Sequence, residues 1–214
     1  MARRIREWSN EHEERLRASG GLGAAARIAG IDEAGRGAWA GPLSVAAVVL
    51  PRVLSPWLAA NIDDSKRLRP AARAEVAAAV REEARVVVEW GSLEAIEEHN
   101  VLGATLRAMA RALEGLGDAD GALIDGDRLP VGVSVPVLGV VRGDGCVRAI
   151  AAASVVAKVA RDALMEELDG DYPEYGFARH RGYGTAMHRE ALRRFGPSRV
   201  HRMSYRPVRA LSFN

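Results

Sequence analysis

IAGIDEAGRG, residues 28–37, sets an apolar run directly before two neighbouring carboxylates, Asp32 and Glu33, and a loop with two glycines. The apolar run predicts a buried strand. Neighbouring residues of a strand point to opposite faces of the sheet, so we expect only one of the two carboxylates to face the core. The pair follows the strand directly and precedes no helical pattern, which favours a functional role over that of an ordinary turn.

The segments around this stretch predict an α/β fold, a mixed β-sheet flanked by helices with a C-terminal helical segment. Strands are expected at 27–32, 43–50, 85–91, 122–125 and 137–141. Helices are expected at 4–17, 70–84, 92–116 with a break near Asn100, 148–168 and 185–195. An irregular tail follows. The domain organisation that we expect is an N-terminal helical extension at 1–20, a core at 21–170, and a C-terminal helical segment packed on the core at 171–214.

Composition limits the class of protein. At 214 residues the chain is long enough for one sizeable domain with a full hydrophobic core. The net charge of +2 with a pI near 9.0 fits a local basic face beside an acidic pocket better than an indiscriminate basic tail. A single cysteine, Cys146, excludes an internal disulfide framework. The chain shows no secretory signal and no membrane-spanning run, so we expect a cytoplasmic protein. The tail ends in LSFN without a longer extension that could act as a tether, so we expect a monomer.

Four carboxylates are candidates for one site. Asp32, Asp125 and Asp144 each lie at or just past the end of a predicted strand, and Glu33 adds a fourth. Strand ends of one sheet converge in space, and crowded carboxylates repel unless protons or cations intervene. Mg²⁺ prefers such oxygen ligands, and two metals can promote phosphodiester hydrolysis. The alternative is structural, because Asp-Gly at 125–126 and 144–145 is a common turn dipeptide.

Five motifs in order resemble the bacterial ribonuclease HII family over residues 28–208. They are IAGIDEAGRGAWAGP, DDSKRL, LIDGDRLP, VVRGDGCVRAIAAASVVAKVARD and GFARHRGYGTAMH. The resemblance implies a ribonuclease H-like core and an endonuclease that depends on Mg²⁺ or Mn²⁺, with two metals in its site. It also implies the substrates, which are RNA/DNA hybrid duplexes and DNA duplexes containing single ribonucleotides. By the same resemblance we expect the cut to fall 5′ of the ribonucleotide and to leave a 3′-hydroxyl and a 5′-phosphate.

The resemblance also assigns the acids. It implies that Asp32, Glu33 and Asp125 are the principal metal ligands and that Asp144 completes the catalytic site. Asp162, in the helix motif AKVARD, is the rival for fourth acid. We favour Asp144 because it matches the acid of the family's Lys-Gly-Asp segment, and we expect Asp162 to be a surface or supporting acid.

Substrate-binding residues are implied in the same way. Gly35-Arg36-Gly37 matches the segment that recognises the 2′-hydroxyl, and Tyr183 matches the tyrosine that checks the sugar beside it. From the sequence alone, Tyr183 could equally anchor a loop. The candidates for phosphate contacts are Lys66, Ser154 and Lys158, followed by Arg142, Arg148 and Arg181. The alternative for Ser154 and Lys158 is the solvated face of their helix.

Some positions depart from the family pattern without removing a proposed ligand. Ala38-Trp39 replaces the usual Pro-Leu, Asp127 replaces asparagine, and Gly184 replaces a proline, which we expect to loosen the loop of Tyr183. The five histidines show no zinc-ligand spacing. Two rival functions remain: another ribonuclease H-like nuclease that needs no 2′-hydroxyl, and a non-catalytic duplex-binding module. A glycosidase is disfavoured by an aromatic content of only 5%.

Overall fold

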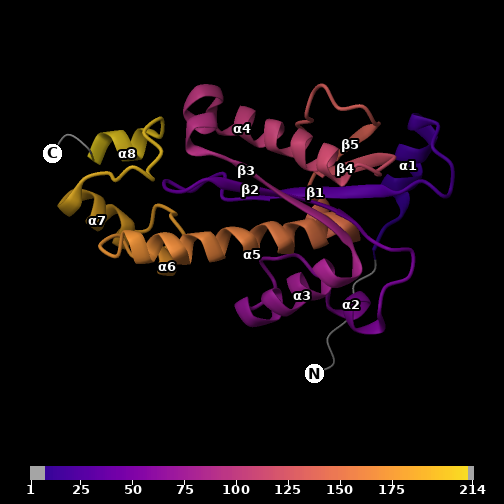
Figure 1. The fold of residues 1–214 in the computed structure, drawn as a ribbon, viewed down its shortest axis with the longest axis horizontal. Coiled ribbons are helices and arrows are strands. Elements are labelled where there is room, and N and C mark those ends of the chain that lie inside the picture. The colour runs from indigo at the N-terminus through magenta and orange to yellow at the C-terminus, as the bar shows by residue number, and fades with distance from the viewer. Residues whose placement is uncertain (1–7, 212–214) are drawn as a thin grey trace.

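The computed structural model describes residues 8–211 and has one five-stranded mixed sheet at its centre (Figure 1). The strands pair in the order β3-β2-β1-β4-β5. β1 is antiparallel to β2 and parallel to β4, β2 is antiparallel to β3, and β4 is parallel to β5. Their bounds are β1 Ile28–Ala34, β2 Leu43–Val49, β3 Arg85–Gly91, β4 Gly121–Asp125 and β5 Val137–Val140.

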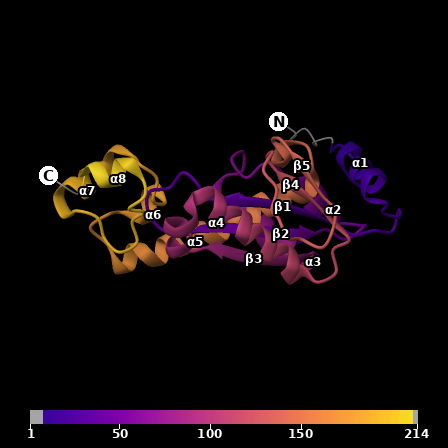
Figure 2. The same cartoon turned by 90° about the horizontal axis from the view of Figure 1, so that it is seen from above.

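Helices cover both faces of this sheet. Figure 1 shows α4 on one face and α5 with α2 and α3 on the other, while Figure 2 shows α1 at one end of the long axis and α6–α8 at the opposite end. The bounds are α1 Glu11–Gly20, α2 Pro56–Asn61, α3 Pro70–Glu83, α4 Leu93–Leu116, α5 Arg148–Asp171, α6 Phe177–His180, α7 Ala186–Phe195 and α8 Arg206–Leu211, with a 3-10 turn, η1, at Gly143–Gly145. The predicted α/β class is confirmed.

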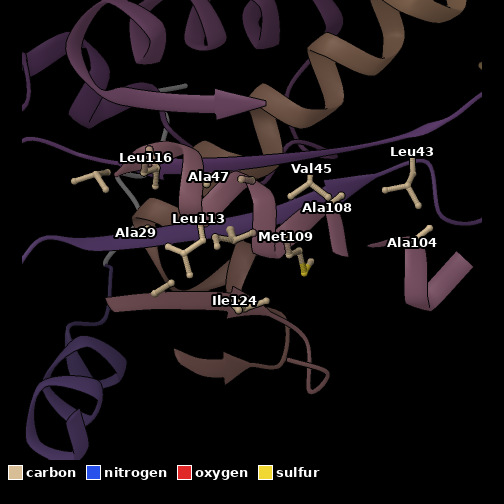
Figure 3. Close-up of a cluster of buried hydrophobic side chains, with 14 of the residues drawn as sticks. Ala29, Leu43, Val45, Ala47, Ala104, Ala108, Met109, Leu113, Leu116 and Ile124 are labelled. Carbon is tan, nitrogen blue, oxygen red and sulfur yellow. The ribbon is translucent and has the colours of Figure 1, made fainter. Parts of the chain in front are cut away.

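Each face of the sheet has its own apolar cluster. Figure 3 shows the cluster under α4, where Met109 and Leu113 pack against Val45 and Ala47 of β2. On the other face, alanines and valines of α5 pack with Val76 and Val80 of α3. Small side chains let α5 lie close to the sheet, because a Cβ added at Gly30 would stand 2.1 Å from the Ala149 carbonyl carbon. This close approach brings α5 beside the end of β1.

Several element boundaries differ from the prediction. β1 continues through both acids to Ala34 instead of ending at residue 32, because Asp32 and Glu33 pair with Ala46 and Val45 of β2. The predicted break at Asn100 is confirmed by its φ of 57° and ψ of 171°. α2 and α8 lie where we expected a loop and an irregular tail.

The N-terminal helix differs at its start. Within the described residues α1 begins at Glu11, whereas the prediction began at residue 4. The predicted turn at residues 4–7 lies outside the described residues. None of the helices within 8–211 is both long and apolar enough to cross a membrane.

Candidate active site

One cavity of about 420 Å³ at the end of β1 gathers most of the predicted site. Ten of the fourteen residues predicted from the sequence line it: Asp32, Glu33, Gly35, Arg36, Gly37, Lys66, Asp125, Ser154, Lys158 and Tyr183. They come from β1, the loop after β1, β4, α5, the loop before α3 and the C-terminal segment. Side chains far apart in sequence are therefore brought to one place by the sheet and by α5.

The two neighbouring acids lie on opposite faces of β1. Asp32 is on the α5 face, is 5% exposed, and its Oδ1 accepts a hydrogen bond from the Glu33 backbone amide at 2.7 Å. Glu33 is on the α4 face, its side chain is 13% exposed, and it accepts a hydrogen bond from Arg36 at 3.2 Å. The two side chains point to opposite faces as expected, but helices cover both faces of the sheet and both carboxylates line the cavity at the strand's end.

The other two acids lie across from β1. Asp125 ends β4, and its Oδ1 accepts a hydrogen bond from the Gly143 backbone at 2.6 Å. That bond ties the end of β4 to η1, which carries Asp144. Asp144 is 7% exposed, and its Oδ2 lies 3.1 Å from the Nζ of Lys66. Asp144 therefore stands beside the cavity residues Asp125 and Lys66.

Burial, and after it the crowding of the acids, shifts the pKa of three of these carboxyl groups. Burial, followed by the charges of Glu33 and Asp125, raises the pKa of Asp32 well above its usual value. Burial also raises the pKa of Glu33. For Asp125, burial and then the charge of Asp144 raise the pKa. Ionised together, these carboxylates are unfavourable, and a nearby cation would relieve the repulsion.

The donor set fits a hard divalent cation. Carboxylate oxygens are the ligands that Mg²⁺ and Mn²⁺ prefer, and burial together with the neighbouring acids raises the pKa of Asp32 and of Asp125. As the side chains stand, no three His, Cys, Asp or Glu residues within 8–211 form a ready metal-binding group. A cation bound by Asp144 would also compete with the Lys66 ammonium for Oδ2.

The polar stripe of α5 is enclosed, contrary to the alternative of a solvated face. Ser154 is 4% exposed, and its Oγ lies 3.0 Å from that of Ser65. The Lys158 ammonium forms a short ion pair with Asp162, and burial lowers the pKa of Lys158. Asp162 also pairs with Arg73 at 3.5 Å. The Asp162 carboxylate thus forms ion pairs with Lys158 and Arg73 next to the cavity.

The glycine loop, residues 35–42, forms one wall of the site. Gly35 has φ +93°, a conformation that favours glycine. A Cβ added at Gly37 would meet only a Tyr183 ring atom, at 3.9 Å, so that glycine leaves open space beside the tyrosine. Tyr183 is 38% exposed. The loop and the tyrosine therefore face the same opening.

Three predicted arginines lie away from the acids. Arg148 stacks over Trp8, 5.8 Å from the ring centroid, and lines a different cavity beside α1. Arg142 is exposed and precedes η1. Arg181 pairs with Glu166 of α5. None of these three arginines lines the cavity that holds the acids.

Two of the departures from the family pattern lie against each other. A Cβ added at Gly184 would lie 2.2 Å from the indole of Trp39. The large Trp39 therefore occupies the space that a side chain at 184 would need, while the expected loosening of the loop stays a prediction.

Sequence reasoning missed Ser65, the buried pair Arg161 and Arg202, and a histidine cluster. His180 and His188 stack at 4.5 Å, and the Nε2 atoms of His188 and His201 lie 3.0 Å apart. The presence of Ser65 and Arg161 inside the DDSKRL and AKVARD motifs was the available signal. The spacing of the histidines in the sequence gave no signal for their cluster.

Comparison with known proteins gives the family. A family model described as Ribonuclease HII matches residues 29–208. The ribonuclease HII of Chlorobium luteolum is 51% identical over 184 residues, covering 84% of this chain and 88% of that protein. The ribonuclease HII of Archaeoglobus fulgidus, solved in complex with PCNA, matches with a TM-score of 0.73 and 28% identity over 87% of this chain and 97% of that one.

A more distant structure, Bst-RNase HIII in complex with Mn²⁺, matches with a TM-score of 0.67 at 21% identity, over 87% of this chain and 69% of that one. That likeness concerns the fold alone. A mixed sheet of this kind, with acids at the ends of β1 and β4, defines a nuclease of the ribonuclease H fold. The chain belongs to the ribonuclease HII family and is thus a type 2 ribonuclease H, a hydrolase of nucleic acid.

Proposed function

We propose that this enzyme is a metal-dependent endonuclease that cuts 5′ of single ribonucleotides in duplex DNA and hydrolyses the RNA strand of RNA/DNA hybrids. The products are a 3′-hydroxyl and a 5′-phosphate, and the place of action is the cytoplasm. The observation that carries the proposal is the shared cavity, which is lined by acids on one side and by the glycine loop and Tyr183 on the other.

Asp32, Glu33, Asp125 and Asp144 would hold Mg²⁺ or Mn²⁺. When bound, such cations would activate the attacking water and neutralise charge on the leaving oxygen. The protein's own part is to fix the carboxylates: the Glu33 amide donates to Asp32, and the Gly143 amide donates to Asp125. Fixed acids lower the reorganisation needed during the reaction.

Selection of the sugar would fall to Gly35, Gly37 and Tyr183. Glycines let backbone groups approach a ribose closely, and the 2′-hydroxyl, which both donates and accepts, distinguishes RNA from DNA. The Tyr183 ring can stack on a neighbouring nucleotide without selecting its base. Arg36, Lys66 and Lys158 line the same cavity and can contact phosphates.

The test is cleavage of a duplex with one ribonucleotide beside an all-DNA duplex, each with Mg²⁺ or Mn²⁺. We expect one cut, 5′ of the ribonucleotide, in the first duplex only. Asp125→Asn should abolish it, whereas Asp127→Asn, a matched change at an exposed side chain two residues away, should not.

Other outcomes would favour the rivals. Equal cutting of both duplexes would indicate a nuclease that needs no 2′-hydroxyl. Binding without cutting under either metal would indicate a duplex-binding module.

A further inference from the structure

Two arginines are buried next to the candidate site. Arg161 on α5 is 1% exposed and Arg202 in the C-terminal segment is 0% exposed. Within residues 8–211, neither guanidinium has a carboxylate within 4.0 Å. Buried charges are normally paired or fully hydrogen-bonded, since desolvation is costly. Their hydrogen bonds therefore reveal what these two side chains do.

Both guanidinium groups donate to the backbone of the glycine loop. Arg202 donates to the carbonyls of Arg36 and Gly41, both at 2.9 Å, and Arg161 to those of Ala40 and Pro42, both at 3.0 Å. The loop is irregular, and an isolated bridge between Ala40 and His201 is its one β-pairing within the described chain. Two side chains from outside the loop thus satisfy four of its carbonyls.

Arg161 also contacts the other sugar-selecting feature. Its guanidinium lies 5.6 Å from the centroid of the Tyr183 ring and donates to the Arg181 carbonyl at 2.8 Å. It also packs against Gly35, where an added Cβ would stand 1.9 Å from Nε. One side chain therefore contacts both the start of the glycine loop and Tyr183.

We propose that Arg161 and Arg202 are positioning residues that hold the glycine loop at the place where it selects the ribose, and that Arg161 also sets the distance from this loop to Tyr183. The inference rests on the proposed function and adds the residues that determine its specificity. Neither arginine lines the cavity, so both act through the loop.

The geometry requires arginine. Its planar fork donates in two directions from one rigid group, whereas lysine is a point charge with a single nitrogen. Arg202 uses two donors of one rigid group, because its Nε and Nη1 donate to different carbonyls. Tyr205 supports the same contact: its hydroxyl donates to the Arg36 carbonyl and accepts from Arg202 at 3.0 Å.

The experiment compares the wild type with Arg161→Lys, Arg202→Lys and Tyr205→Phe. The matched control is Arg85→Lys, since Arg85 donates to the Leu116 carbonyl, away from the cavity. The substrates are a duplex with one ribonucleotide and a duplex with four consecutive ribonucleotides flanked by DNA. Folding is checked by circular dichroism and thermal unfolding.

We expect kcat on the single-ribonucleotide duplex to fall about 10- to 100-fold in the two lysine variants, since small misplacements can cost about that much. The kcat of Tyr205→Phe on this duplex should fall less. The distribution of cuts along the four ribonucleotides should also change in these variants but not in Arg85→Lys. A smaller folded fraction lowers every cut equally and cannot redistribute them.

Unchanged kcat and cut distribution in folded variants would overturn the inference, and so would a lower kcat with an unchanged distribution. If the lysine variants fail to fold, kcat and the cut distribution of Tyr205→Phe decide the test. This substitution disturbs the fold less, because the Tyr205 side chain is partly exposed. A wild type that cuts neither duplex would instead overturn the proposed function.

Discussion

The carboxylate of Asp125 ends β4 in an environment that disfavours its charge. Burial and then Asp144 raise its pKa, so the folded state holds this proton more tightly than the unfolded state does. An acid with a raised pKa contributes stability below its unfolded pKa and loses that contribution as the pH rises through the folded pKa. Without divalent metal at neutral pH, Asp125→Asn should therefore raise the Tm, by about 2–4 °C for each kcal/mol relieved.

Thermal unfolding in EDTA at pH 7.5 and at pH 4 checks this. The difference between Asp125→Asn and the wild type should shrink at the lower pH, where the wild-type carboxyl takes up its proton. Asp127→Asn should leave the Tm unchanged. A lower Tm for Asp125→Asn at pH 7.5 would contradict the expected repulsion.

Trp39 and Gly184 form a second test at single residues. Gly184→Ala would place a Cβ 2.2 Å from the indole, and overpacking of this kind costs about 1–3 kcal/mol. Trp39→Leu should recover most of that loss in the double variant, measured as a coupling free energy by urea unfolding. Gly170→Ala, where no atom lies within 4 Å of the added Cβ, is the control. Additive effects of the two changes would refute direct packing.

The limits of sequence reasoning are visible at these residues. Asp32 and Asp125 could be predicted because apolar runs locate strands and strand ends converge. Arg161 could not be assigned, because a helix of charged and apolar residues does not tell which arginine is buried. Arg148 was predicted at the site from its motif alone, and the direction of α5 places it beside Trp8 instead.

At the scale of elements, α6, α7 and the segment after α7 meet through three histidines. His201 Nδ1 accepts from the Ser198 amide at 2.9 Å, so its Nε2–H donates to His188 Nε2. His188 Nδ1–H then donates to the Tyr183 carbonyl at 3.0 Å. The sequence shows no sign of this cluster, because the histidines are spaced by turns between elements and not by one helical or strand period.

This cluster predicts a loss of stability in mild acid. Burial lowers the pKa of both His188 and His201 to about 4. The unfolded chain binds protons below about 6.5 while the folded chain stays neutral, so the stability present above 6.5 is lost as the pH falls toward 4. Each histidine should contribute a slope of about 1 kcal/mol per pH unit.

Urea unfolding between pH 7 and 5 measures the effect. The destabilisation caused by His201→Gln should shrink as the pH falls, because the variant no longer carries that titrating group. The difference between wild type and variant isolates the histidine from the acids of the candidate site, whose raised pKa values act with the opposite sign. A difference that is constant with pH would contradict the prediction.

For the whole molecule, the distribution of exposed apolar side chains favours a monomer. Among the large apolar side chains of residues 8–211, Val53, Val131 and Val141 are the most exposed, at 84%, 90% and 70%, and they lie in separate loops or beyond the end of a strand. The large apolar side chains of the C-terminal segment, up to residue 211, are at most 50% exposed. Stable homodimers usually bury a larger continuous apolar surface. Light scattering after size-exclusion chromatography should give a mass near 23.0 kDa. A mass of twice that value would contradict the expectation.

Divalent metal should stabilise the whole fold, because the acids that it would bind come from β1, β4 and η1. A ligand at 100 times its Kd adds about 2.7 kcal/mol of stability when it binds only the folded state. In a chain of this size that corresponds to a Tm increase of about 5–10 °C. Mg²⁺ or Mn²⁺ should therefore raise the Tm of the wild type and of Asp127→Asn. The Tm of Asp32→Asn should rise much less, because this variant loses the most enclosed carboxylate of β1. NaCl at matched ionic strength separates specific binding from screening, and an equal increase in Asp32→Asn would place the metal elsewhere.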